Sequence, residues 1–103
     1  MDFSTKVGDT RAAIRATLSP ASGAALTDIK EVRFRMSNTL FSNKIDRVVD
    51  DFTNPVATLI FTAAEVANPG TYYGEFVVEY NDDTIETFPN DSYLEIQILK
   101  NVG

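Results

Sequence analysis

Aspartates stand side by side at Asp50-Asp51 and at Asp82-Asp83, and another follows at Asp91. Two carboxylates at a defined separation are the acid and base of glycosidases. Each of these aspartates lies among turn-forming residues, however, where an aspartate side chain usually bonds to its own backbone. We therefore interpret them as turn residues that face solvent.

Asparagines beside two of these turns suggest a second chemistry, because carboxylate and amide oxygens are ligands for Ca²⁺. If both turns lie at one end of the fold, five side chains would converge there: Asn81, Asp82, Asp83, Asn90 and Asp91. The spacing of a calcium-binding loop is absent. The prediction is that the chain holds no metal, and this cluster is the alternative.

Histidine and cysteine are both absent from the 103 residues. The chain therefore lacks the commonest general base, the thiol nucleophile, the thiolate ligands of structural zinc and any disulfide. A serine–lysine pair is a nucleophilic combination that the composition permits, but no spacing points to one. We expect a protein that is not an enzyme, without catalytic residues and without a cofactor.

Acidic residues outnumber basic ones by 15 to 9, which gives a net charge of −6. Binding to nucleic acid or to an anionic membrane requires clustered lysines and arginines, and here they are scattered. We find neither a secretory signal nor an apolar run of about 20 residues. The sequence thus predicts synthesis in the cytoplasm and partners other than nucleic acid or membrane.

Tyr72 and Tyr73 suggest a platform for a sugar ring, because aromatic faces pack against apolar ring faces. Alternation along the segment 72–80 places Tyr72 in the core and Tyr73 outside. Carbohydrate binding is therefore an alternative function, in which Tyr73 is the candidate contact.

Apolar and polar residues alternate with a period of two along most of the chain, and turn-forming residues recur about every ten positions. The segments predicted as strands are 11–18, 31–36, 44–49, 56–61, 72–80, 84–88 and 93–99. About seven short strands predict one domain, residues 1–103, folded as an all-β, two-sheet antiparallel sandwich. Its last three strands should form a meander.

A capping box is present at Thr62-Ala63-Ala64-Glu65, where the threonine and glutamate side chains can satisfy each other's backbone N–H groups. It predicts one short helical turn through Ala67. Asn68-Pro69-Gly70 should end that turn before the next strand begins.

The segment 56–61 is apolar at every position except Thr58, which predicts a strand covered on both faces. With nearby apolar residues it supplies more apolar side chain than one small core absorbs, and such a surplus marks a protein contact. The candidate contact residues are Val56, Thr58, Ile60, Leu40, Phe41, Phe52 and Tyr73.

Nearly the whole chain resembles a known family, through the segments 7–10, 11–18, 32–36, 69–76 and 86–96. In the last two, Gly-Thr-Tyr-Tyr-Gly-Glu-Phe is followed at hairpin distance by Phe-Pro-Asn-Asp. This pattern is similar to the immunoglobulin-like domain at the N-terminus of baseplate upper proteins of tailed viruses. The resemblance implies an immunoglobulin-like sandwich and a structural role in a virion, with no catalytic residues.

We therefore expect a non-enzymatic structural or assembly protein of a tailed bacteriophage, made in the host cytoplasm and located in the virion. Baseplate, tail, neck, fibre and capsid decoration are all compatible positions. Its expected partners are other virion proteins and copies of itself, bound through protein contacts. The alternative is a small carbohydrate-binding or host-adhesion module.

Overall fold

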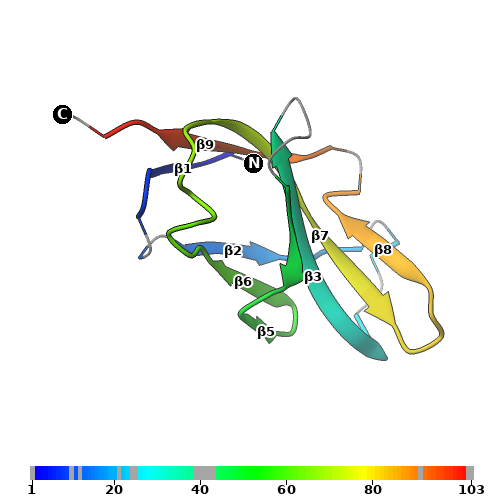
Figure 1. Cartoon of the computed structure of the whole chain (residues 1–103). Coiled ribbons are helices and arrows are strands. Elements are labelled where there is room, and N and C mark those ends of the chain that lie inside the picture. The colour runs from blue at the N-terminus through cyan, green and yellow to red at the C-terminus, as the bar shows by residue number, and fades with distance from the viewer. Residues whose placement is uncertain are drawn as a thin grey trace.

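The computed structural model describes residues 2–9, 11, 13–20, 22–23, 26–38, 44–90 and 92–101. The described residues form nine strands and no helix, and the strands pack as two facing sheets (Figure 1). The predicted all-β class and two-sheet sandwich are confirmed. No helix in these ranges is long and apolar enough to cross a membrane.

The larger sheet has six strands, in the order β1-β9-β7-β3-β4, with β8 also paired to β7. Their bounds are Asp2–Lys6 (β1), Leu94–Leu99 (β9), Gly70–Tyr80 (β7), Ile29–Asn38 (β3), Lys44–Val48 (β4) and Ile85–Phe88 (β8). Every pair is antiparallel except β1 and β9, which run parallel. The sheet is therefore mixed, whereas the sequence predicts a purely antiparallel one.

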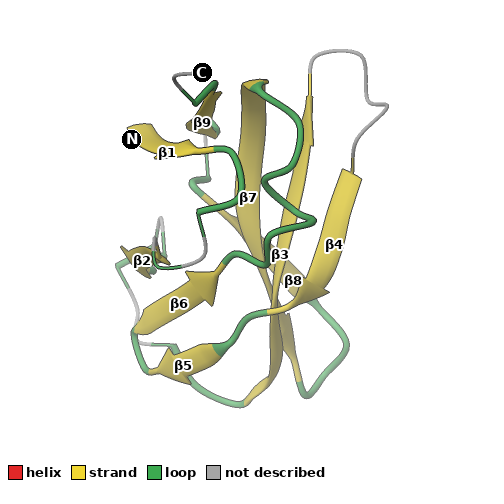
Figure 2. Cartoon of the chain, turned by 60° about the vertical axis from the view of Figure 1, so that its left-hand side comes forward, coloured by secondary structure: helices red, strands yellow, loops and turns green. Residues whose placement is uncertain are grey.

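The smaller sheet has three strands, in the order β2-β6-β5. Their bounds are Ala13–Thr17 (β2), Val56–Ile60 (β6) and Asp51–Thr53 (β5). Both pairs are antiparallel. Figure 2 shows this sheet as a separate layer beside β3 and β7, so one of its sides faces the core and the other faces away from the larger sheet.

Strand β7 organises the larger sheet, because its 11 residues are long enough to pair with three partners. One edge pairs with β3, while on the other edge Gly70 to Gly74 pair with β9 and Phe76 to Glu79 pair with β8. Strands β8 and β9 thus follow each other along one edge. The predicted meander, in which β9 would lie beside β8, is wrong. Pro89 stands between them, and a proline has no N–H to continue the ladder.

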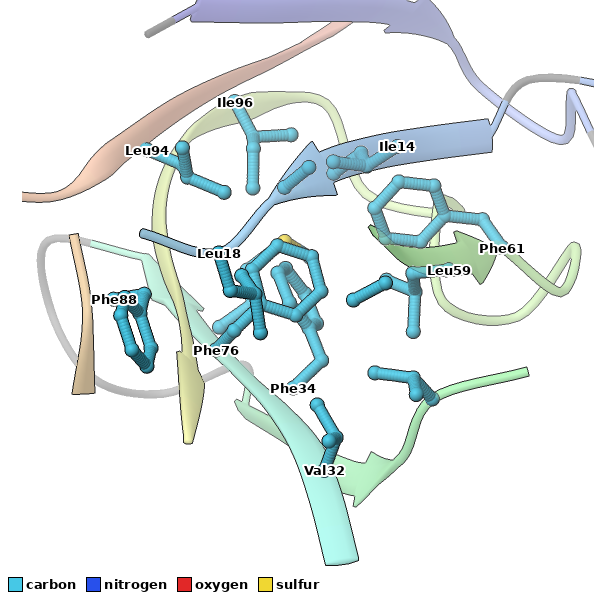
Figure 3. Close-up of a cluster of buried hydrophobic side chains, with 14 of the residues drawn as sticks. Ile14, Leu18, Val32, Phe34, Leu59, Phe61, Phe76, Phe88, Leu94 and Ile96 are labelled. Atoms are coloured by element: carbon cyan, nitrogen blue, oxygen red, sulfur yellow. The ribbon is translucent and has the colours of Figure 1, made fainter. Parts of the chain in front are cut away.

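The core between the sheets is aromatic at its centre (Figure 3). The Phe34 ring centroid lies 5.1 Å from that of Phe76 and 6.3 Å from that of Phe61. Gly74 leaves room for this packing, because a Cβ there would lie 2.8 Å from the Phe34 ring and 2.9 Å from the Ile96 side chain. The alternation predicted for the strands is confirmed. The buried positions include Val32, Phe34, Met36, Tyr72, Phe76, Val78, Leu94, Ile96 and Ile98.

Two of the nine strands lie where the sequence predicts none. Strand β1 pairs with β9, and its Phe3 ring lies 6.0 Å from that of Phe61. Strand β5 occupies a segment that the sequence marks as a turn, since three residues are too few to show a period of two.

The predicted helical turn forms as a hydrogen-bonded turn without helix, in which the Glu65 N–H donates to the Thr62 carbonyl at 3.1 Å.

Replacing Phe76 by alanine should lower the free energy of unfolding by about 3–5 kcal/mol, because its ring is buried against Phe34. Ile85→Ala is the control, since Ile85 is 60% exposed on a strand of the same sheet. The control should change stability by less than about 0.5 kcal/mol. Chemical denaturation measures both effects, and equal losses would contradict the assignment of faces.

Candidate functional site

The outward side of the smaller sheet is the candidate site, and we call it the small-sheet face. Strand pairing sets its members, because residues directly opposite each other in an antiparallel pair project to the same side. They are Ala13, Arg15, Thr17, Val56, Thr58, Ile60, Asp51 and Thr53. The face thus combines a central apolar strand with polar and charged residues on both edge strands.

Three predicted contact residues lie on this face, with unequal exposure. Ile60 is 45% exposed, Val56 is half-buried, and Thr58 is only 8% exposed. The inward residues of the same strand, Ala57 and Leu59, are fully buried in the core. The chain itself leaves Ile60 in solvent, so the predicted cover for the outward end of this strand has to come from a partner.

The exposed end of β6 is held by an arginine of the larger sheet. The Ile60 carbonyl accepts a hydrogen bond from Arg47 Nη2 at 2.8 Å, and the Ile60 N–H donates to Asp50 Oδ2 at 2.6 Å. Arg47 Nη1 also donates to Asp50 Oδ2 at 3.2 Å. Both backbone groups of Ile60 are therefore satisfied while its side chain stays exposed.

The same arginine forms a bidentate ion pair with Glu65. Arg47 Nε donates to Glu65 Oε2 at 2.7 Å and Nη2 donates to Oε1 at 3.0 Å. Burial acts to raise the pKa of Glu65, but the hydrogen bonds from Arg47 and Thr62 and the positive charge of Arg47 outweigh it and lower that pKa. The hydrogen bond to Glu65 raises the pKa of Arg47. This pair is charged at neutral pH.

Glu65 also completes the predicted capping box. The Thr62 N–H donates to Glu65 Oε1 at 2.8 Å, and the Glu65 N–H donates to Thr62 Oγ1 at 3.3 Å. The predicted reciprocal hydrogen bonds are confirmed. The Glu65 carboxylate also forms the ion pair with Arg47. The capping box therefore fixes the segment that leaves β6.

The remaining predicted contact residues do not join the small-sheet face. Phe52 stands opposite Ala57 and points inward, where it packs against the core. Tyr73 is 39% exposed on the outer side of the larger sheet, opposite Ser37. Leu40 and Phe41 lie outside the described residues. The face instead includes Arg15 and Asp51, which the sequence did not mark as contact residues. Alternation along β2 did not assign Arg15 to a site, and β5 was too short to be recognised as a strand.

Tyr73 has an aromatic neighbour that the sequence did not suggest. The Tyr93 ring centroid lies 6.0 Å away, with 60° between the ring planes, and Tyr93 is 63% exposed. Glu95 stands opposite Tyr73 and accepts a hydrogen bond from Gln97 at 2.9 Å. The two tyrosines form an exposed aromatic pair bordered by amide and carboxylate groups.

The outer side of the larger sheet otherwise carries ion pairs formed within the chain. Arg35 meets Glu75, which stands directly opposite it on β7, at 3.0 Å. Arg33 meets Asp46 at 3.0 Å and Glu31 at 3.5 Å, and Lys30 meets Glu79 at 3.1 Å. Pairs as exposed as these contribute little to stability, because water and salt screen them. Most charged side chains on β3 and β7 of this side are therefore paired within the chain.

Asp82 and Asp83 act as turn residues, as predicted, whereas Asp51 lies in strand β5. Asp82 Oδ1 accepts hydrogen bonds from Thr84 N at 3.0 Å and from Thr84 Oγ1 at 2.6 Å, and these bonds lower the pKa of Asp82. Asp83 has a positive φ of 67° and lies 3.5 Å from the Lys30 ammonium group. Asp50 is bound to Arg47.

The calcium alternative required the turns near Asp82 and Asn90 to lie at one end of the fold. The structure places them at opposite ends of β8, about 10 Å apart by the rise of a strand. Across the described ranges, no group of three or more acidic side chains is arranged to hold a metal ion. Asp91 lies outside those ranges.

Comparison of the chain with protein-family models, with curated proteins and with solved structures gave no match. The resemblance to the immunoglobulin-like domain of viral baseplate proteins therefore stays a prediction from the sequence.

Glu65→Gln should lower the free energy of unfolding by about 1–3 kcal/mol at neutral pH, because it removes a charge-assisted pair with Arg47. The pKa of Glu65 is lowered in the fold, so its stabilising effect is complete above about pH 4.5 and is lost at more acidic pH. Denaturation of both proteins across pH measures this. Glu75→Gln, in an exposed pair, is the control and should cost about 0–1 kcal/mol. A difference from wild type that stays constant into strong acid would contradict the pairing.

Proposed function

We propose that this chain is a non-enzymatic structural protein of a tailed-virus particle, which acts through protein–protein contacts. The context is supported by the resemblance of the segments 69–76 and 86–96 to the immunoglobulin-like domain of baseplate proteins. Baseplate, tail, neck, fibre and capsid decoration remain the candidate positions. Other virion proteins and copies of the chain are the proposed partners.

The observation that carries the proposed mode of action is the composition of the small-sheet face. Val56 and Ile60 project outward from β6, although the core is already filled by inward residues such as Leu59 and Phe61. An apolar centre with a polar rim is the usual arrangement of a protein interface. On the outer side of the larger sheet the central strands β3 and β7 instead carry ion pairs, and the exposed Val48 and Ile85 lie on the flanking strands β4 and β8.

A partner that covers this face would bury mainly the Ile60 side chain. Full burial of an isoleucine contributes about 1.5–3 kcal/mol relative to full exposure, and roughly half of that remains to be gained here. Because Arg47 and Asp50 hold the backbone of Ile60, little ordering cost opposes the contact. The face is thus preorganised for binding.

Ile60→Asp should abolish assembly with the virion partners while the fold is retained. Ile85→Asp is the matched control, since both residues are exposed isoleucines on outward sides of strands. The measurement is copurification and sedimentation with the structural proteins encoded by neighbouring genes, with melting curves to verify folding. Unchanged assembly of Ile60→Asp would contradict the use of the small-sheet face.

A second candidate function, carbohydrate binding or host adhesion, is favoured by the Tyr73 and Tyr93 pair. Both rings are exposed, and hydrogen-bonding groups of Glu95 and Gln97 lie on the adjacent strand. Aromatic surface beside such groups suits the apolar and hydroxyl faces of a sugar ring.

For this second function, Tyr73→Ala and Tyr93→Ala should each remove glycan binding measured on a glycan array. Ile60→Asp should leave it unchanged, because that residue lies on the other sheet. If the wild-type chain binds no glycan on the array, carbohydrate binding is rejected, and the proposed assembly function is unaffected.

A further inference from the structure

One row of the small-sheet face carries opposite charges on its two edge strands. Arg15 of β2 and Asp51 of β5 both stand directly opposite Thr58 of β6, so the three residues lie in line across the sheet. Both charged residues are exposed. Two strand spacings, about 10 Å, separate their backbones. In the described part of the chain, neither of them forms an ion pair.

We propose that the small-sheet face packs against the same face of a second copy, about a twofold axis parallel to β6. The choice of face rests on the proposed function, and the partner is added here. Rotation about this axis exchanges the two edge strands, so Arg15 of each copy lies over Asp51 of the other. Arg15 and Asp51 of the two copies thereby form two ion pairs, one on each side of the axis.

The charges select this axis over the other twofold arrangement of stacked faces. An axis perpendicular to β6 leaves each edge strand over its own counterpart, which places Arg15 over Arg15 and Asp51 over Asp51. Like charges brought together in an interface oppose association and suppress that arrangement. Both axes give the aligned packing that is usual for stacked sheets, so the charges alone distinguish them.

The centre of the face permits close approach. Val56, Thr58 and Ile60 meet their own counterparts along the axis, and Thr58 at the middle is small and already covered. Stacked sheets lie about 10 Å apart, a gap that an extended arginine and an aspartate bridge together. A face of three short strands is smaller than the roughly 800 Å² per partner of a standard interface. The isolated pair is therefore weak, and repeated contacts in a particle strengthen it.

Charge reversal tests the proposal. Arg15→Asp and Asp51→Arg each place like charges in both contacts, so each variant alone should associate at least about tenfold more weakly than wild type. An equimolar mixture of the two should recover association as a heterodimer, because every aspartate then faces an arginine. Sedimentation velocity up to the solubility limit measures this. Arg35→Asp, on the outer side of the larger sheet, should leave association unchanged.

Cross-linking tests the direction of the axis, because the chain has no cysteine of its own. Thr17 and Thr53 both stand opposite Val56, and the proposed axis lays Thr17 of one copy over Thr53 of the other. A short bis-maleimide should join Thr17→Cys to Thr53→Cys in a mixture, and should join neither variant to itself. Products from a single variant, without any from the mixture, would overturn the proposed axis.

A wild-type chain that stays monomeric at every concentration overturns the proposal, and so does a mixture of charge variants that fails to associate. Either result is distinct from failure of the proposed function. In that case Ile60→Asp would still abolish binding to another virion protein, and the face would serve a different partner.

Discussion

The guanidinium group of Arg47 joins the two sheets at the side of the sandwich where β4 approaches β6. It donates five hydrogen bonds, two to Glu65, one to Asp50 and one each to the Ile60 and Val48 carbonyls. An arginine has five N–H donors in a fixed planar arrangement, and a lysine could not reach these acceptors together. The charge is balanced by two carboxylates, so its partial burial is compensated.

The candidate contact surface depends on this arginine although Arg47 is not part of it. Ile60 is the last residue of β6, where a strand ordinarily leaves backbone groups to water. Here its N–H and its carbonyl are bonded to Asp50 and Arg47, and the capping box holds the residues that follow. The side chain can therefore stay exposed on a rigid backbone, which lowers the entropy cost of any contact it makes.

Alternation along the sequence predicted the faces of single strands well and the arrangement of strands less well. It identified Phe34 and Phe76 as core residues because a period of two depends only on neighbours in the chain. The order of strands depends on distant pairings, which is why the attachment of β9 to β7 was not predicted. For the same reason the candidate contact residues do not share one face, since Phe52 points inward and Tyr73 lies on the larger sheet.

The two outer sides of the sandwich differ in how their charges are compensated. On the larger sheet, arginines and acidic residues pair across adjacent strands, so these charges are compensated within the chain. On the smaller sheet, β6 separates Arg15 from Asp51, and neither forms an ion pair with another residue that the structure describes. A contact confined to one twofold face closes after two copies and cannot propagate. Incorporation into a larger array would then require a second surface, and the exposed Tyr73 and Tyr93 pair lies on the opposite sheet.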